Sequence, residues 1–291
     1  MTDGSSTALR HHDLGDVTFL ERKGEGRTVV FLHGIGSNSD SFAPLFEQFP
    51  EGPRLIAWNA PGYLSSKPLA PAAPTAQDYA AALERFFDSL CLSEATLAGH
   101  SLGTLIAARF ALRAPNRVSS IVLVAAARGY GVKPGEPLPP SAAKRLDDLG
   151  KQGPAAFAEE RAPRLVFQPE RNPSVVALVR KEMARINPDG YAQAVHMLAS
   201  GNLAEDVAQL HQKPGFIIGA EDQITPMDQT NLAMRAWAEA NGTMPRCISI
   251  AGAGHAVYGQ ATHAFMDAMM ELVPDLHTKT PSHSEEELHG G

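Results

Sequence analysis

A serine between two glycines is the first residue of this chain whose type and setting could do chemistry. The pentapeptide Gly99-His100-Ser101-Leu102-Gly103 follows the short apolar run 95–98 and precedes the helical pattern 105–110. A serine at a tight strand-to-helix turn holds its hydroxyl away from the sheet, and flanking glycines let the strand and the helix approach closely. The pattern predicts that Ser101 is a nucleophile and that the Leu102 amide helps to stabilise an oxyanion.

Two further side chains could activate Ser101, because a serine hydroxyl needs a general base and that base needs an orienting group. His255 lies in a glycine-rich segment after the apolar run 247–250, and Asp222 follows the run 216–218. We expect both at the sheet edge that carries Ser101, because the carboxyl ends of parallel strands meet there. The chain order serine, aspartate, histidine differs from the orders of chymotrypsin-like and subtilisin-like proteases. Glu221 is the alternative carboxylate.

A fourth element precedes the serine, at the turn His33-Gly34-Ile35-Gly36 after the apolar run 28–32. The glycines let the backbone turn so that the Ile35 amide faces the nucleophile, and we predict the Ile35 and Leu102 amides as oxyanion donors. His33 and Gly34 are candidate substrate contacts, although His33 is better suited to hydrogen bonds within its own loop than to proton transfer. We expect His100 to pack beside the turn, with its side chain directed away from the Ser101 hydroxyl.

Arg128 and Tyr130 are the other candidate substrate contacts. They follow the apolar run 120–124, where the chain leaves the predicted sheet. Arg128 could recognise a substrate carboxylate, because guanidinium groups bind carboxylates through paired hydrogen bonds. A structural ion pair is the alternative role for Arg128.

The elements that must position these residues form an α/β pattern. Apolar runs without strict alternation are separated by helical patterns such as 81–90, which indicates a parallel sheet covered on both faces. A weaker edge hairpin is predicted over 12–22. The predicted strands of the main sheet are 28–32, 55–58, 95–98, 120–124, 216–218 and 247–250.

The segment from Gly129 to Gly201 interrupts this pattern, because it is long, begins with several prolines and is then mostly helical. We interpret it as a helical cap inserted into a core formed by residues 1–128 and 202–276, and we expect a disordered tail at 277–291. Residues 128–200 hold 11 Lys and Arg against 8 Asp and Glu, which leaves a net charge of −10 for the rest of the chain. A cap that favours anionic substrates is one interpretation, and a solvated helical surface is the other.

Composition narrows the classes of partner. The chain has 291 residues, a net charge of −7 and 44% hydrophobic residues. Without a basic cluster or a long apolar run, we expect no binding to nucleic acid or membranes, and small molecules are the predicted partners. The polar segment Met1–Asp16 has no apolar signal region, so we expect a cytoplasmic protein, either a monomer or a homodimer.

The remaining reactive side chains suggest no further chemistry. Cys91 and Cys247 are interpreted as two buried thiols, because two cysteines are too few for a disulfide framework and lack the spacing of metal ligands. The histidines outside the site also lack metal-ligand spacing. We therefore predict no metal and no cofactor.

With these residues in view, the chain resembles the α/β-hydrolase superfamily over about residues 17–273. The group it is most similar to includes enol-lactone hydrolases, carboxylesterases and meta-cleavage C–C hydrolases. The resemblance implies an eight-stranded, mostly parallel sheet, a helical cap after the sixth strand and hydrolysis through an acyl-enzyme. One departure concerns the turn Asn59–Ser66, where Leu64 stands in place of a glycine that is frequent in the family.

Three functions remain open at this level. The leading hypothesis is a cofactor-independent serine hydrolase that cleaves an ester or lactone of a small organic acid through Ser101, Asp222 and His255. An amidase or a C–C bond hydrolase would use the same residues, because selection between these bonds depends on contacts with the cap and the leaving group. A cofactor-free oxygenase or a ligand receptor on the same fold is the third hypothesis.

Overall fold

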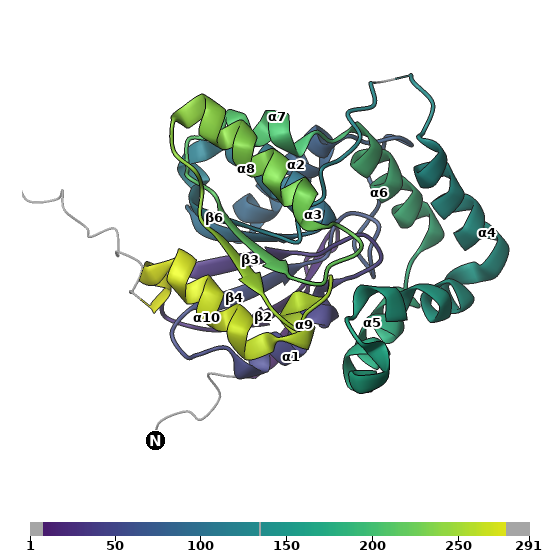
Figure 1. The fold of residues 1–291 in the computed structure, drawn as a ribbon, viewed down its shortest axis with the longest axis horizontal. Coiled ribbons are helices and arrows are strands. Elements are labelled where there is room, and N and C mark those ends of the chain that lie inside the picture. Colours follow the sequence, from purple (N-terminus) through teal and green to yellow (C-terminus); the bar gives the residue numbers. More distant parts are fainter. Residues whose placement is uncertain (1–7, 134, 278–291) are drawn as a thin grey trace, which may run out of the picture.

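An eight-stranded sheet organises the protein in the computed structural model, which describes residues 8–133 and 135–277 (Figure 1). The strand order is β1-β2-β4-β3-β5-β6-β7-β8, with β1 and β2 antiparallel to their neighbours and β3 to β8 parallel to one another. The eight-stranded, mostly parallel sheet is therefore confirmed. The strands are β1 (Leu9–Asp13), β2 (Thr18–Arg22), β3 (Thr28–Leu32), β4 (Arg54–Trp58), β5 (Ala95–His100), β6 (Val118–Val124), β7 (Gly215–Gly219) and β8 (Cys247–Ile250).

Helices cover both faces of this sheet (Figure 1). Within β3, Val30 and Leu32 pack toward one face while Val29 and Phe31 pack toward the other, so successive residues are all buried. This explains why the strands appear in the sequence as continuous apolar runs. The first face carries α2 (Ala76–Ser89), α3 (Leu102–Arg113), α7 (Leu203–Ala208) and α8 (Met227–Asn241), and the second carries α1 (Ala43–Gln48), α9 (Val257–Gln260) and α10 (Thr262–Leu272).

Three longer helices between β6 and β7 lie beside the sheet rather than on either face (Figure 1). They are α4 (Pro140–Arg161), α5 (Pro173–Met183) and α6 (Pro188–Ser200), and the 3-10 helices η3 (Ala162–Leu165) and η4 (Pro169–Arg171) lie between α4 and α5. Some of their buried side chains, including Leu149, Phe157 and Tyr191, form a separate apolar cluster, whereas Met197 and Leu198 of α6 pack with the first face of the sheet. Within α4, Gly153 has a φ of 72° and is followed by Pro154, so the helix is kinked there. Further 3-10 helices are η1 (Ser39–Phe42), η2 (Pro115–Arg117) and η5 (Pro274–His277).

The two chain segments that connect these helices to the sheet lie side by side. Gly129 forms a bridge with Asn202, and the Gly131 amide donates to the Gly201 carbonyl at 2.9 Å. A Cβ atom on Gly129 would lie 2.0 Å from the Gly201 oxygen, so this crossing requires a glycine. We keep 129–201 as the proposed limits of the cap. Residues 278–291, in the expected tail, lie outside the described residues.

One prediction about cysteine is wrong. Cys91 is exposed, because it follows the end of α2 in a left-handed turn with a φ of 51°, and Cys247 is only partly buried. Burial raises the pKa of the Cys247 thiol. Across the described residues, no helix combines the length and the apolar character that crossing a membrane requires.

Candidate active site

The Ser101 turn is built by the close packing of β5, α3 and β3. Ser101 has a φ of 52° and a ψ of −115°, a strained conformation for a residue with a side chain. A Cβ on Gly99 would lie 2.5 Å from the Gly103 oxygen, and a Cβ on Gly103 would lie 2.2 Å from the Leu32 oxygen. Both glycines of the pentapeptide are therefore required by backbone contacts. They let the turn lie against β3 while Ser101 lines the cavity described below.

Asp222 and His255 meet at the same sheet edge, in the loops after β7 and β8. His255 Nδ1 lies 2.9 Å from Asp222 Oδ2, and Ser101, Asp222 and His255 are each at least 95% buried. Asp222 Oδ1 accepts hydrogen bonds from the Ile224 amide at 2.8 Å and the Thr225 amide at 3.0 Å. Burial by itself raises the pKa of Asp222, but the His255 charge and these hydrogen bonds together hold that pKa below its ordinary value. The carboxylate is thus ionised and can orient the imidazole.

Glu221, the alternative carboxylate, is directed elsewhere. Glu221 Oε2 accepts a hydrogen bond from the Ala253 amide at 3.1 Å. It therefore fixes the loop that carries His255, whereas Asp222 contacts the His255 ring directly. The geometry favours Asp222 as the partner of His255.

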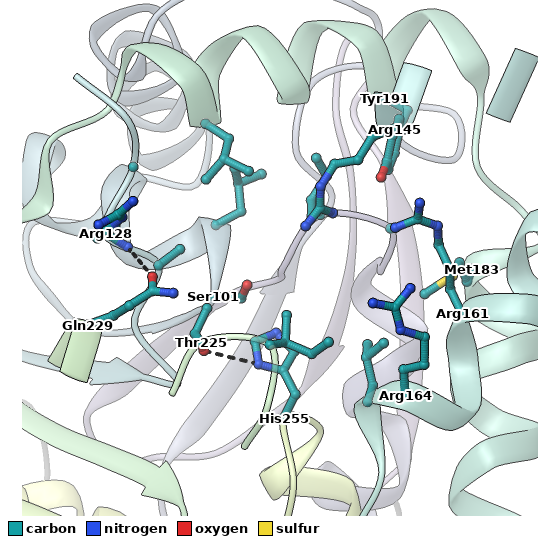
Figure 2. Close-up of a pocket in the computed structure, with 18 of the residues that line it drawn as sticks. Ser101, Arg128, Arg145, Arg161, Arg164, Met183, Tyr191, Thr225, Gln229 and His255 are labelled. Atoms are coloured by element: carbon teal, nitrogen blue, oxygen red, sulfur yellow. Dashed lines mark hydrogen bonds between the residues drawn. The ribbon is translucent and has the colours of Figure 1, made fainter. Parts of the chain in front are cut away.

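Thr225 belongs to the same network, although no role was predicted for it from the sequence. Its hydroxyl lies 3.2 Å from His255 Nδ1 (Figure 2) and 2.9 Å from Asp222 Oδ2, and it donates to the Ala125 carbonyl at 2.9 Å. An Asp followed three residues later by Thr and then by Pro226 is a local turn signal that could have indicated it. Thr225 therefore links the acid loop to the end of β6.

A cavity of about 380 Å³ lies between this network and the cap. Ser101 and His255 line it together with Ile35 and Leu102, the two expected oxyanion donors. Leu102 is the first residue of α3, and amides in the first turn of a helix have no acceptor within that helix. The arrangement brings a hydroxyl, an imidazole–carboxylate pair and a candidate amide donor to one small cavity. It can support nucleophilic attack on a carbonyl group.

The structure does not bring His33 to this cavity. The His33 ring is buried, with Nδ1 2.9 Å from the Gly34 oxygen and Nε2 accepting from the Ala60 amide at 3.1 Å. These bonds place the ring proton on Nδ1, and burial lowers the pKa of His33 to about 4. Gly34 packs against the turn instead, since a Cβ there would lie 3.0 Å from Ser101 Cβ. Neither residue lines the 380 Å³ cavity.

His100 packs behind the turn, as its position before Ser101 suggested. Its Nε2 donates to the His255 carbonyl at 2.9 Å, and the two rings lie 4.8 Å apart. Burial lowers the pKa of His100 to about 3, so the ring is neutral. His100 therefore supports the backbone of His255.

Arg128 and Tyr130 do line the cavity, and both are exposed. The Arg128 amide donates to Gln229 Oε1 at 3.0 Å (Figure 2), while the Tyr130 hydroxyl lies 3.1 Å from the Ser141 hydroxyl. Among the residues that the structure describes, Arg128 forms no ion pair through its side chain. The structural ion pair considered for Arg128 is therefore not formed within that part of the chain.

Three further arginines line the cavity from the cap, namely Arg145, Arg161 and Arg164. No role was predicted for these three residues from the sequence, although the net positive charge of the cap segment was a signal of them. Leu64 does not line the cavity. It has a φ of 48°, so it occupies a left-handed conformation in which a glycine would be unstrained.

Within residues 8–133 and 135–277, no cluster of three or more histidine, cysteine or acidic side chains could hold a metal ion.

Comparison with known proteins places the chain in a family. The family model described as alpha/beta hydrolase fold matches residues 27–262, so the protein belongs to the α/β-hydrolase family. It is 25% identical to a pimeloyl-[acyl-carrier protein] methyl ester esterase of Aliivibrio salmonicida, with 89% of this chain and 94% of that protein aligned. It is 26% identical to an (E)-2-((N-methylformamido)methylene)succinate hydrolase of Acinetobacter baylyi, over 75% of this chain and 92% of that protein. Two further relatives match this chain over less than half of their own length, since the alignments cover 35% of one protein and 49% of the other.

A solved structure agrees with the fold. The enol-lactonase of Burkholderia xenovorans superposes with a TM-score of 0.77 at 19% identity, covering 91% of this chain and all of that one. The α/β-hydrolase fold expected from the sequence is confirmed. The two relatives that align over most of their length are thus named as an esterase and a hydrolase.

Proposed function

We propose that this protein is a serine hydrolase that cleaves a carboxylic ester or a lactone of a small molecule through an acyl-enzyme on Ser101. One observation carries the proposal. Asp222 and His255 form a buried pair at 2.9 Å, and His255 and the strained Ser101 line one cavity. A strained serine beside an oriented imidazole is the arrangement that acyl transfer needs.

In the first half of the reaction, the Ser101 hydroxyl oxygen attacks the substrate carbonyl carbon while His255 Nε2 takes the hydroxyl proton. Asp222 holds the proton on His255 Nδ1 and stabilises the positive ring that forms. The Ile35 and Leu102 amides donate to the negative oxygen of the tetrahedral intermediate. The bond to the leaving oxygen then breaks, and His255 gives its proton to that oxygen.

In the second half, water replaces the leaving group. His255 takes a proton from the water, and the oxygen attacks the acyl carbon bound to Ser101. The acyl–serine bond breaks, and His255 returns the proton to Ser101. The products are an acid and an alcohol, or a hydroxy acid when the substrate is a lactone, and the enzyme regains its starting state.

An ester or a lactone is proposed as the bond class because one relative is named a methyl ester esterase and one structural neighbour an enol-lactonase. Amides and C–C bonds in diketones remain the competing substrates of the same residues. Turnover on an ester, an amide and a diketone that share one acyl group ranks the three. Oxygen uptake without hydrolysis would contradict the proposal and favour an oxygenase.

The direct test is Ser101→Ala. We expect loss of labelling by an organophosphonate, measured by mass spectrometry, and a fall in kcat of about 10⁴ or more, as for other deleted triad nucleophiles. Ser89→Ala is the matched control, because Ser89 lies at the end of α2 and its hydroxyl donates to the Phe86 carbonyl. Esterase activity retained in Ser101→Ala would refute the proposal.

A further inference from the structure

Three arginines gather on the cap side of the cavity. Arg145 and Arg161 come from α4 and Arg164 comes from η3, and we call them the cap arginine cluster. Figure 2 shows their side chains reaching toward the centre of the cavity from one side of Ser101, with Arg128 on the opposite side. The nucleophile therefore lies between a cluster of three guanidinium groups and a single one.

The positive charge of this cluster is only partly neutralised. No aspartate or glutamate is found among the described residues that line the cavity. Arg161 pairs with Asp148 at 2.9 Å, but Asp148 lies outside the lining and also pairs with Lys144. In the part of the chain that the structure describes, Arg145 and Arg164 form no ion pair. The cluster keeps a positive charge facing the space next to Ser101.

Arg161 is held in place before any ligand arrives. Its guanidinium carbon lies 4.3 Å from the centre of the Phe157 ring, and its side chain is only 16% exposed. Its Nε atom is buried and has no hydrogen-bond partner among the described residues. A buried donor without an acceptor is costly, so an acceptor oxygen from a ligand would relieve that cost. A surface arginine that merely contacts water would not need such packing.

We propose that the cap arginine cluster binds a carboxylate of the substrate, at a position remote from the carbonyl that Ser101 attacks. The substrate is then an ester or a lactone that carries a free carboxylate. Planar guanidinium groups match the two oxygens of a carboxylate, and a cavity of about 380 Å³ suits a small acid. The exposed Arg128 adds positive charge on the other side of Ser101 and attracts anions toward the site. This inference rests on the proposed function and names its substrate class.

The test compares esters that differ only by a carboxylate in place of a methyl group. Monomethyl glutarate and methyl valerate differ in this way on the acid side, and carboxymethyl butyrate and ethyl butyrate on the alcohol side. Hydrolysis is followed by proton release. We expect kcat/KM to be at least tenfold higher for the anionic member of at least one pair.

The variants are Arg145→Gln and Arg164→Gln, alone and combined. Neither removes the partner of a carboxylate, because neither arginine forms an ion pair among the described residues. We expect each to lower the ratio of anionic to neutral kcat/KM by about tenfold, mainly through KM, and the pair to lower it by about a hundredfold. Arg171→Gln is the matched control. Arg171 is an exposed arginine of the same cap that does not line the cavity, so the ratio should stay within twofold.

Binding separates failure of this inference from failure of the proposed function. Calorimetry with glutarate should show weaker binding to the Arg145 and Arg164 variants than to the wild type, whether or not the protein hydrolyses esters. A wild type that hydrolyses neutral and anionic esters equally, or a ratio that the variants leave unchanged, overturns the carboxylate site while Ser101 keeps its role. Inorganic phosphate that competes more strongly than glutarate would assign the cluster to phosphate groups and overturn it as well.

Discussion

Replacing Asp222 by asparagine tests how the site sets the tautomer of His255. Asp222 Oδ1 accepts two backbone hydrogen bonds, from Ile224 and Thr225, and Oδ2 faces His255 Nδ1. In Asp222→Asn the amide oxygen should keep the two backbone bonds, which places the NH₂ group against His255. The ring must then accept at Nδ1 and carry its proton on Nε2, where it cannot take the proton of Ser101.

The size of the effect follows from those two bonds. Rotating the asparagine amide by half a turn would point its oxygen at His255 and restore the tautomer with the proton on Nδ1. The same rotation would break both backbone hydrogen bonds, because the Ile224 and Thr225 amides would then face the NH₂ group. At about 1–3 kcal/mol for each unsatisfied donor, the cost is roughly 2–6 kcal/mol, or about 30-fold to 10⁴-fold in rate. The lost negative charge adds to this, because it no longer stabilises the protonated ring. We expect kcat/KM to fall by about 10³ to 10⁴.

The assay is kcat/KM on the best methyl ester of the wild type, with circular dichroism to confirm folding. Glu221→Gln is the matched control, because this neighbouring carboxylate contacts the Ala253 amide and not His255. Glu221→Gln should change kcat/KM by less than about threefold, because it affects only the hydrogen bond to the Ala253 amide in the loop that carries His255. A folded Asp222→Asn protein that loses less than about 30-fold would refute the tautomer argument.

The remaining predictions concern stability. Burial lowers the pKa of His33 to about 4 and that of His100 to about 3, so between pH 6.5 and pH 4 the unfolded chain binds protons that the folded chain does not. The free energy of unfolding should therefore decrease by about 4 kcal/mol from pH 7.5 to pH 5. Urea denaturation at these two pH values measures the change. Equal stability at both would contradict the conclusion that the two rings are buried and neutral. Gly103→Ala should lower the free energy of unfolding by about 1–3 kcal/mol, because the new Cβ would meet the backbone of β3. Gly150→Ala in α4 should instead raise the free energy of unfolding by about 0.5–1 kcal/mol, because nothing lies within 4 Å of the new Cβ and alanine favours a helix. Thermal unfolding compares the two variants, and a Gly103→Ala protein as stable as the wild type would argue against the tight crossing.

The core of the fold was predictable because its strands are buried on both faces. The run 28–32 coincides with β3, and 247–250 coincides with β8. The glycines on either side of Ser101 were also informative, because close backbone contacts leave no room for a side chain at Gly99 or Gly103. Asp222 and His255 could be placed because strand ends share one sheet edge.

The cap arginine cluster could not be predicted from helical spacing. Arg145 and Arg161 are 16 positions apart, which in an unbroken helix puts them roughly 160° apart around the axis. The kink at Gly153 changes that relation, so both side chains line the cavity. The position of the kink is visible in the sequence as the pair Gly153-Pro154. The directions in which the kink turns the two arginine side chains depend on how the two halves of α4 pack. Cys91 was misjudged because cysteines are usually buried, whereas this one occupies an exposed turn.

The crossing of Gly129 and Gly201 has a consequence for how this protein could change during evolution. Because the two ends of the intervening segment already touch, another segment of different length could be grafted between them without separating β6 from β7. Ser101, Asp222 and His255 all lie outside that segment, while the cap arginine cluster lies within it. A single recombination between relatives could therefore exchange the proposed carboxylate site and leave the three proposed catalytic residues in place.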